Sequence, residues 1–242
     1  MPKSYSAAHT SLPARYEPAW GAEFWEYVEQ ALKPGAVVLD VGSGRRPTIA
    51  AAERPPDCHY VGLDVVASEL EISAAGSYNE TVVADVQKLT PGLCGRFDLI
   101  VAWQVLEHVK DMSSTAAVLH EYARDGGWFI TTLSGRYAAY ALANRLLPAR
   151  VGGRLVARLR DRPIETVFQA HYDRCTAEGL RTAFSCWEEL RVVPLWHAAD
   201  YFDRFPRLQR LYLGYENLVS ERGFEGLATN YVIAARKGVS PI

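Results

Sequence analysis

The chain has 242 residues, of which 49% are hydrophobic and 22% are charged, and its formal net charge at pH 7 is -2. This length is enough for one α/β domain over 1–242 with a modest insertion, and the composition is typical of a folded globular protein rather than a disordered one. The nearly balanced charge excludes the strongly basic footprint of a protein that binds duplex nucleic acid.

The N-terminal region predicts a loose tail and one amphipathic helix. Residues 1–12 contain no apolar core of a secretory signal, and no run of about 20 apolar residues occurs in the chain, so we expect a cytoplasmic protein. Over 18–32 the apolar residues Trp20, Phe24 and Val28 recur at i, i+4 and i+8, which predicts a helix. We therefore interpret 1–34 as a tail followed by a covering helix.

The most informative segment is Val37-Val38-Leu39-Asp40-Val41-Gly42-Ser43-Gly44, an apolar strand that ends in an acid and turns through two glycines. Such a turn lets backbone N–H groups approach a ligand closely, because neither glycine has a Cβ atom. A dinucleotide dehydrogenase usually has a third glycine three residues later, whereas this chain continues with Arg45-Arg46-Pro47. The acid before the first glycine suits a cationic amino group better than a pyrophosphate. Pro47 is placed where a helix would begin.

Three later segments also join an apolar strand to a polar end. Val61-Gly62-Leu63-Asp64 and Val82-Val83-Ala84-Asp85-Val86 reach an acid, and the segment Phe97 to Val109 runs from a strand into Leu106-Glu107-His108-Val109. Together with Asp40-Val41-Gly42-Ser43-Gly44, these segments resemble, in order, the motifs of class I S-adenosylmethionine-dependent methyltransferases in their Leu-Glu-His-Val variant. Four matches in register are far more specific than one glycine turn.

The resemblance implies that the chain binds S-adenosylmethionine and releases S-adenosylhomocysteine. In that family the first motif holds the methionine part, the second acid accepts the ribose hydroxyls, the third motif lies beside the adenine and the fourth beside the sulfonium. Carried onto this sequence, the cofactor-binding residues are Asp40, Gly42, Ser43 and Gly44 for the methionine part, Asp64 and Val65 for the ribose, Asp85 and Val86 for the adenine, and Trp103 and Gln104 for the sulfonium.

Short apolar runs alternate with helical patterns from Gly35 onward, which is typical of βαβ units. We predict an α/β fold with a Rossmann-like, seven-stranded, mostly parallel sheet and helices on both faces. The last strand follows a long connection and is expected to pair antiparallel near the sheet edge. The predicted strands lie near 37–41, 59–64, 80–84, 97–102, 127–133, 188–195 and 229–236.

Residues 135–170 predict a helical, arginine-rich insertion after the fifth strand, where seven arginines meet one acid, Asp161, before Glu165. An insertion at this edge of the sheet lies over the entrance for substrates. It is either a solvated basic face, a lid that reads an anionic substrate, or a contact with an anionic membrane through 135–162. The membrane contact is not the favoured interpretation.

Two histidines are the candidate catalytic residues. His108 follows the fourth strand at the edge that faces the transferred methyl group, and His171 precedes a helix expected to start around Thr176. A histidine can act as a general base near neutral pH, although methyl transfer needs a base only when a hydroxyl must lose its proton. Each histidine also has a structural alternative, as a packing, capping or solvated residue, and His197 is a third candidate.

No metal site is expected, because the four cysteines lack metal-ligand spacing and Gln104 stands where metal-binding relatives have a first Glu. The free thiols are expected to be reduced. The resemblance also implies a covering helix and an acceptor pocket. On that basis the candidate substrate-binding residues are Tyr16 and Trp20, which would close over the ligand, and Tyr172 and Trp196, which would line the pocket.

The predicted function is transfer of a methyl group from S-adenosylmethionine to a small molecule, with oxygen as the favoured acceptor atom in a sugar, glycan, lipid-linked or secondary-metabolite compound. Methylation of nucleic acid is disfavoured, because no Asn-Pro-Pro-Tyr or Asp-Pro-Pro-Tyr sequence follows the fourth strand and no Pro-Cys pair is present. The alternatives are an inactive regulatory or scaffold protein that binds the cofactor, and a cofactor-binding enzyme of non-methylating chemistry. The sequence leaves the acceptor and the oligomeric state open.

Overall fold

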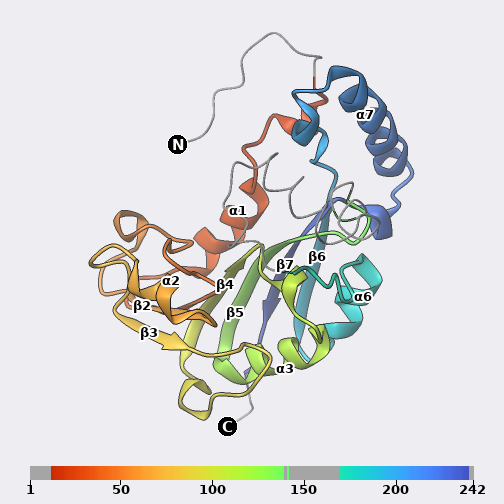
Figure 1. The fold of residues 1–242 in the computed structure, drawn as a ribbon. Helices are drawn as coiled ribbons and strands as arrows, with labels where there is room; N and C mark the ends of the chain where they lie inside the picture. Colours follow the sequence, from red (N-terminus) through yellow and green to blue (C-terminus); the bar gives the residue numbers. More distant parts are fainter. Residues whose placement is uncertain (1–11, 139–140, 142–168, 240–242) are drawn as a thin grey trace.

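A seven-stranded sheet forms the centre of the computed structural model, which describes residues 12–138, 141 and 169–239. The strand order is β3-β2-β1-β4-β5-β7-β6. All neighbouring strands pair parallel except β7, which runs antiparallel to both β5 and β6. The predicted mostly parallel sheet with an antiparallel last strand is therefore confirmed (Figure 1).

The strands lie close to the predicted segments, because each is an apolar run bounded by turn residues. In chain order they are β1 (Val37–Val41), β2 (His59–Asp64), β3 (Glu80–Val83), β4 (Phe97–Trp103), β5 (Ala123–Ser134), β6 (Glu189–Leu195) and β7 (Asn230–Arg236). Only β5 is clearly longer than expected, since it begins at Ala123 with a pairing to Phe97 before the register shifts.

Helices cover both faces of the sheet, as predicted. On one face α1 (Ala22–Ala31) buries Phe24 and Val28, two of the residues whose spacing predicted it. On the other face lie α3 (Met112–Tyr122) and α6 (Ala177–Ala183). Asp111 caps α3 by accepting from the Ser114 amide at 3.0 Å, and Thr176 caps α6, where that helix was expected to begin.

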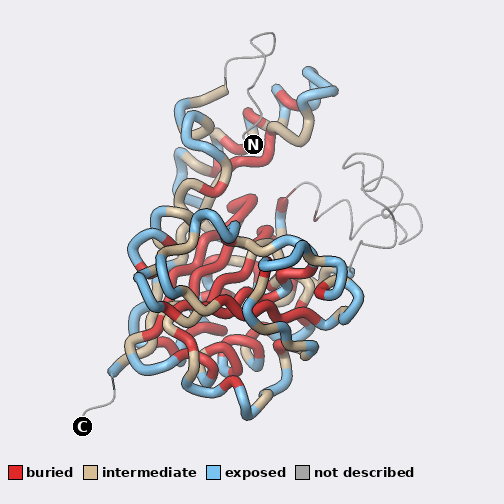
Figure 2. The backbone as a smooth tube through the Cα atoms, turned by 90° about the vertical axis from the view of Figure 1, so that its left-hand side faces the viewer, coloured by how far each residue is buried: buried red, intermediate tan, exposed pale blue. Residues whose placement is uncertain are grey.

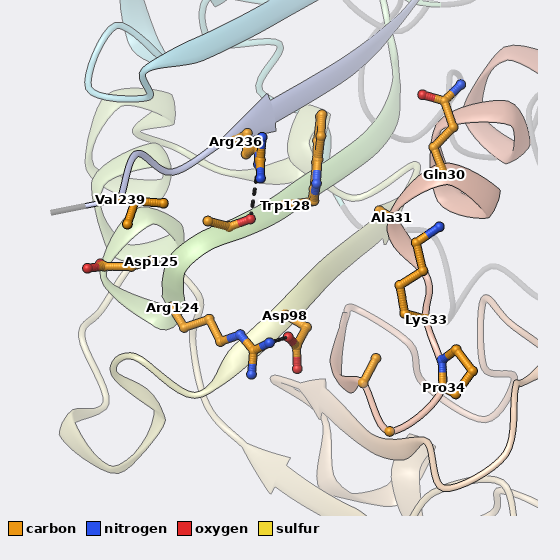
Figure 3. Close-up of a pocket in the computed structure, with 13 residues that line it drawn as sticks. Gln30, Ala31, Lys33, Pro34, Asp98, Arg124, Asp125, Trp128, Arg236 and Val239 are labelled. Carbon is orange, nitrogen blue, oxygen red and sulfur yellow. Dashed lines mark hydrogen bonds and ion pairs between the residues drawn. The ribbon is translucent and has the colours of Figure 1, made fainter. Parts of the chain in front are cut away.

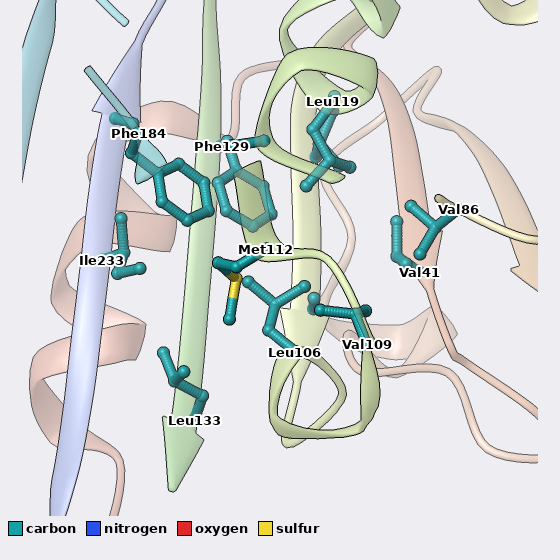
Figure 4. Packing of buried hydrophobic residues seen from close by; sticks show 14 of the residues in the cluster. Val41, Val86, Leu106, Val109, Met112, Leu119, Phe129, Leu133, Phe184 and Ile233 are labelled. Atoms are coloured by element: carbon teal, nitrogen blue, oxygen red, sulfur yellow. The ribbon is translucent and has the colours of Figure 1, made fainter. Parts of the chain in front are cut away.

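The hydrophobic core consists of two clusters, one on each side of the sheet, and Figure 2 shows the buried strands between exposed loops. In the larger cluster, residues from η4 (Leu106–His108), α3 and the central strands interlock (Figure 4). The rings of Phe129 and Phe184 stack with centroids 5.5 Å apart. Burial of such side chains stabilises the fold by roughly 1.5–3 kcal/mol each.

The connection from β1 to β2 differs from the prediction, because no α-helix follows the glycine turn. The described chain there contains turns and one short 3-10 helix, η2 (Ala51–Glu53). The Asp40 carboxylate accepts hydrogen bonds from the Thr48 amide at 2.6 Å and from the Thr48 hydroxyl at 2.7 Å. These bonds draw the chain back toward β1 just after Pro47, so the expectation that Pro47 begins a helix is wrong.

The long segment between β6 and β7 contains η6 (Ala199–Phe202), α7 (Pro206–Glu221) and η7 (Glu225–Leu227). It is joined to η1 (Ala14–Tyr16) through buried Glu216 of α7, which accepts hydrogen bonds from the Tyr16 hydroxyl and, at 2.8 Å, from the Ala198 amide. The aromatic residues of this region differ in burial, since Tyr201, Phe202, Tyr212 and Tyr215 are partly buried. Phe205 and Phe224 lie on the surface, 53% and 47% exposed.

The remaining elements are the short helix α2 (Ala67–Glu71), which packs near β2, and η3 (Pro91–Leu93). Of the predicted insertion at 135–170, residues 139–140 and 142–168 lie outside the described residues. Within the described ranges, no helix combines the length and the apolar character that a membrane-crossing segment needs.

Candidate functional site at the carboxyl edge of the sheet

One edge of the sheet collects most of the residues that the sequence analysis singled out. Because β1, β2, β3, β4 and β5 are parallel, their carboxyl ends lie together, and the end of β6 and the start of β7 reach the same edge. In open α/β sheets ligands bind outside this edge. The four acid- or amide-bearing segments after β1, β2, β3 and β4 are thus neighbours in space, in the order given by the strands.

Contacts with the end of β2 and with Val105 constrain the glycine turn after β1. Gly42 and Gly44 have φ values of 66° and 51°, which few residues other than glycine adopt without strain. The Gly42 amide donates to the Leu63 carbonyl at 2.7 Å, which ties the turn to the end of β2. A Cβ atom on Gly42 would lie 2.5 Å from Cγ2 of Val105, so a side chain here would displace Val105 or the turn.

Asp40 is fully buried, and the hydrogen bonds that its carboxylate accepts hold the loop that follows the glycine turn. Besides its two bonds from Thr48, its carboxylate accepts a hydrogen bond from the Tyr60 hydroxyl at 2.8 Å. Burial raises the pKa of Asp40 to about 6, although these three donors act in the opposite direction. The Tyr60 hydroxyl in turn accepts from the Ile49 amide at 3.0 Å. Asp40 therefore anchors the loop from Gly42 to Ile49.

Asp64 ends β2 and faces the same turn. One of its oxygens accepts from the Gly44 amide at 3.0 Å, and the other accepts from the Val66 amide at 2.9 Å. Tyr78 completes this corner, since its hydroxyl donates to the Gly44 carbonyl at 3.0 Å. Sequence reasoning missed Thr48, Tyr60 and Tyr78, whose roles depend on long-range contacts that no motif records.

The segment after β3 is held in a similar way. An oxygen of Asp85 accepts hydrogen bonds from the amide and the side chain of Gln87, at 3.0 and 3.1 Å. Val86 is buried, whereas Val65, next to Asp64, leaves 64% of its surface exposed. Val65 is therefore exposed enough to contact a ligand at this edge.

Trp103 and Gln104, at the end of β4, have different surroundings: Trp103 packs among aromatic rings, and Gln104 is hydrogen-bonded to β5. The Trp103 ring packs edge-on against Trp20 and Phe24, with both centroid distances 4.9 Å. Gln104 has a left-handed backbone with φ 56°, and its side-chain oxygen accepts from the Ser134 hydroxyl at 2.6 Å. Its side-chain nitrogen is buried and has no hydrogen-bond partner among the described residues. Within the described part of the chain, this amide nitrogen is therefore a donor that no protein group satisfies.

The segments of His108 and His171 lie against each other. The Glu107 carbonyl accepts from the amides of His171 and Tyr172, at 2.8 and 3.0 Å, and Nδ1 of His108 lies 3.2 Å from the Gln169 carbonyl oxygen. The Glu107 side chain is 4% exposed, and burial raises its pKa, against the opposing effects of His108 and Ser134. This buried carboxyl group was not among the predicted functional residues.

A cavity of about 180 Å³ lies between the N-terminal segment and the end of β6. Tyr16 and Trp20 line it, together with His197 and Asp200. The Tyr16 and His197 ring centroids are 5.2 Å apart. Burial lowers the pKa of His197, although the nearby Glu23 carboxylate acts in the opposite direction. The imidazole is therefore neutral at pH 7 and able to accept a proton.

The other two predicted acceptor residues do not line this cavity. Tyr172 is 2% exposed and lies in the larger core cluster, in a left-handed conformation with φ 52°. Trp196 packs at the edge of the same cluster, and its carbonyl accepts from Arg15 at 2.9 Å. Of the four predicted substrate-binding residues, only Tyr16 and Trp20 therefore line the small cavity.

A larger cavity, of about 580 Å³, lies at the opposite edge of the sheet. Figure 3 shows its lining, in which Arg124 pairs with Asp98, and Arg236 donates to the Gly126 carbonyl at 3.2 Å. No predicted site residue lines this cavity. Within the described ranges, no three His, Cys, Asp or Glu side chains are grouped to hold a metal ion.

Comparison with known proteins gives consistent similarities. A family model described as a methyltransferase domain matches residues 15–227. A ubiquinone biosynthesis O-methyltransferase of Chromobacterium violaceum is 30% identical over 115 residues, which cover 45% of this chain and 49% of that protein. This chain therefore matches about half of the length of that relative.

Two solved structures resemble the fold over most of the chain. A geranyl diphosphate methyltransferase, solved with geranyl diphosphate and sinefungin, has a TM-score of 0.55 at 17% identity and covers 90% of this chain and 78% of its own. The cyclase SpnF has a TM-score of 0.56 at 15% identity and covers 97% of this chain and 88% of its own. At these identities the likeness establishes the shared fold.

Proposed function

The chain belongs to the methyltransferase domain family, and on that premise we propose that it transfers a methyl group from S-adenosylmethionine to a hydroxyl oxygen of a small molecule. The observation that carries this proposal is the turn from Gly42 to Gly44, which lies against Asp64 at the carboxyl edge of the sheet. Oxygen as the acceptor atom is supported by the O-methyltransferase activity in the name of the similar Chromobacterium violaceum protein.

The proposed cofactor position follows the strand order. The turn residues Gly42, Ser43 and Gly44 would hold the methionine part above β1, and Asp64 and Val65 would hold the ribose at the neighbouring β2. Asp85 and Val86 would lie beside the adenine at β3, and Trp103 and Gln104 beside the sulfonium at β4. Asp40 would act through Thr48, because its oxygens already accept three hydrogen bonds from the protein.

The small cavity is the proposed acceptor site. It is lined by Trp20, whose ring packs on Trp103, so the cavity and the sulfonium side of the proposed cofactor site share an aromatic wall. A sulfonium methyl group supplies the electrophile. The protein's contribution is then to align the acceptor, exclude water and remove the hydroxyl proton.

His197 is the proposed general base. Its ring lines the cavity, and its lowered pKa keeps it unprotonated at neutral pH. The nearby Glu23 carboxylate would stabilise the imidazolium that forms when the acceptor loses its proton. His108 and His171, whose segments lie against each other, remain candidates for the general base and are tested beside His197.

The cofactor proposal is tested by calorimetric titration with S-adenosylhomocysteine, with NAD as the control ligand. We expect micromolar binding that Asp64→Ala abolishes, because this carboxylate holds Gly44 and is proposed to hold the ribose. Asp203→Ala, which removes an exposed carboxylate beyond η6, is the matched control and should bind normally. Preference for NAD, or equal binding by both variants, would contradict the assignment.

The catalytic proposal is tested with labelled S-adenosylmethionine and two acceptors, catechol and 4-nitrocatechol. The nitro group acidifies the phenol, so 4-nitrocatechol is largely ionised at neutral pH and needs no base. His197→Gln should slow transfer to catechol by roughly a hundredfold but transfer to 4-nitrocatechol much less. His108→Gln and His171→Gln are measured in parallel, and a selective loss in either would move the base there. Cofactor binding without transfer to any hydroxyl compound would overturn the proposed reaction.

A further inference from the structure

The outer face of α7 is apolar although it faces solvent. Leu208, Leu211 and Leu218 are 44%, 74% and 48% exposed, and they lie on one side of the helix together with Tyr215. Phe205, at the start of α7, adds a further exposed ring. We call these residues, with the adjoining Tyr212, the outer face of α7.

Aromatic contacts extend this apolar face toward η6. The Tyr212 ring packs against Phe202 with a centroid distance of 5.1 Å and against Tyr215 at 5.7 Å. The opposite side of α7 is already occupied, since Gln209, Leu213, Glu216 and Val219 are buried against η6 and its surroundings. The exposed leucines are therefore not needed to attach the helix to the protein.

Exposed arginines flank the same face. Arg204, Arg207 and Arg210 surround its N-terminal half, and Arg222 follows its last turn. None of these four arginines takes part in an ion pair with another described residue. The exposed acids beside them are Asp203 and Glu221, so the surface has an excess of two positive charges.

The exposed leucines and the arginines together indicate which kind of surface could cover α7. A second copy of the chain, packed with two-fold symmetry, would bring two sets of unpaired arginines together. An anionic lipid surface satisfies both features, because apolar side chains enter the acyl boundary while arginines contact the headgroups. We propose that the outer face of α7 docks on the surface of an anionic bilayer.

The position of α7 would bring a docked bilayer near the proposed acceptor cavity. Figure 1 places α7 at the end of the molecule opposite the C-terminus, beyond the sheet. Its inner side carries Glu216, which binds the Tyr16 hydroxyl beside the small cavity. A bilayer held against α7 would thus lie close to the cavity. The proposal stands without the assigned chemistry, since it concerns a different surface.

The test is co-sedimentation of the whole chain with vesicles. We expect binding to vesicles of phosphatidylglycerol mixed with phosphatidylcholine, weak binding to phosphatidylcholine alone, and loss of binding at high salt. The double variant Leu208→Gln, Leu211→Gln should reduce partitioning roughly tenfold or more because it removes the apolar contact. Arg207→Gln and Arg210→Gln should each reduce it about fivefold.

Leu89→Gln is the matched control, because Leu89 is 51% exposed but lies after β3, away from α7. It should bind vesicles like the wild type. Circular dichroism and thermal melts should show that all variants fold, since each change is on the surface. Absence of binding to the anionic vesicles, or binding that the α7 variants leave unchanged, would overturn the proposal. So would a dimer in sedimentation velocity that Leu211→Gln dissociates, because the face would then be a contact between copies.

Discussion

At the scale of single residues, Gly42 and Gly35 separate the effect of backbone strain from that of a close contact. Both have positive φ, 66° and 74°, but a Cβ atom on Gly42 meets Val105 whereas one on Gly35 meets nothing within 4 Å. Gly35→Ala should therefore cost only the strain, about 1–2 kcal/mol. Gly42→Ala should in addition displace the turn and reduce the affinity for S-adenosylhomocysteine at least tenfold.

The measurement is calorimetric titration of both variants, with thermal melts to compare their stabilities. An equal loss of affinity in the two variants would mean that strain alone disturbs the site. Normal affinity in Gly42→Ala would remove the turn from the cofactor site altogether.

Asp40 predicts a pH dependence of stability. Its pKa is raised from 3.8 to about 6 in the folded protein, so the native state binds more protons than the unfolded state between these values. The free energy of unfolding should therefore fall as pH rises from about 4 to 6, by at most about 3 kcal/mol from this group. Above pH 6 the ionised, buried carboxylate remains a cost to stability.

Asp40→Asn tests this directly, because an amide oxygen can still accept from the Thr48 amide and the Tyr60 hydroxyl, while its nitrogen can donate to the Thr48 hydroxyl. Urea unfolding from pH 4 to pH 8 should show a flatter profile for the variant between pH 4 and 6. A slope identical to that of the wild type would assign the pH dependence to other groups.

At the scale of elements, the link between η1 and α7 closes the N-terminal segment over the small cavity. The Tyr16 hydroxyl donates to Glu216 and accepts from the Ala199 amide at 2.9 Å. Tyr16→Phe leaves both partners without this hydroxyl and should lower the free energy of unfolding by about 1–3 kcal/mol. Cleavage by trypsin after Arg15 should become faster, because Arg15 is bound to the same part of α7.

The matched control is Tyr27→Phe on α1, since the Tyr27 hydroxyl makes no hydrogen bond to another described residue. Its stability and its rate of cleavage should match those of the wild type. If Tyr16→Phe behaved like Tyr27→Phe, the link would not hold the segment in place.

The elements also show what a sequence can predict. Strands such as β1 and β2 were located because an apolar run that ends in an acid has a strong local pattern. The path of the chain after Gly44 was not predicted. It depends on hydrogen bonds that Asp40 accepts from Thr48, eight residues away, and from Tyr60, twenty residues away, and local propensity does not record such contacts. The exposure of Phe205 has a related cause, because an aromatic residue indicates burial on average, but whether a neighbour covers it depends on how α7 packs.

The candidate site also contains residues that local motifs predict and residues that only the tertiary structure brings together. Residues of the glycine turn and the strand-end acids follow from motifs, because the chemistry needs particular residue types at particular strand ends. The cavity that contains His197 combines residues from η1, α1 and the end of β6, which lie far apart in the sequence. Their meeting depends on the tertiary structure, so the sequence pattern alone does not favour His197 over His108 and His171.

At the scale of the whole molecule, the two edges of the sheet differ in what they can do. The larger cavity lies at the edge where β1 and β4 begin, and its charged side chains Asp98, Arg124 and Arg236 pair with neighbouring groups. The cavity near the carboxyl edge is smaller, but this edge carries the positive-φ turn and the buried amide nitrogen of Gln104, which no other described residue satisfies. Ligand binding in parallel sheets depends on the direction of the strands rather than on the size of a cavity.

A charge at the edge where β1 and β4 begin should therefore not affect the cofactor. Lys33→Glu reverses an exposed charge that lines the larger cavity, at the opposite edge from Asp64. We expect the variant to bind S-adenosylhomocysteine and to transfer methyl groups within about twofold of the wild type, because the charges are screened over that separation. Titration and turnover are measured beside Asp64→Ala. A loss of affinity in Lys33→Glu comparable to that in Asp64→Ala would mean that the ligand occupies the larger cavity, and the argument from strand direction would fail for this protein.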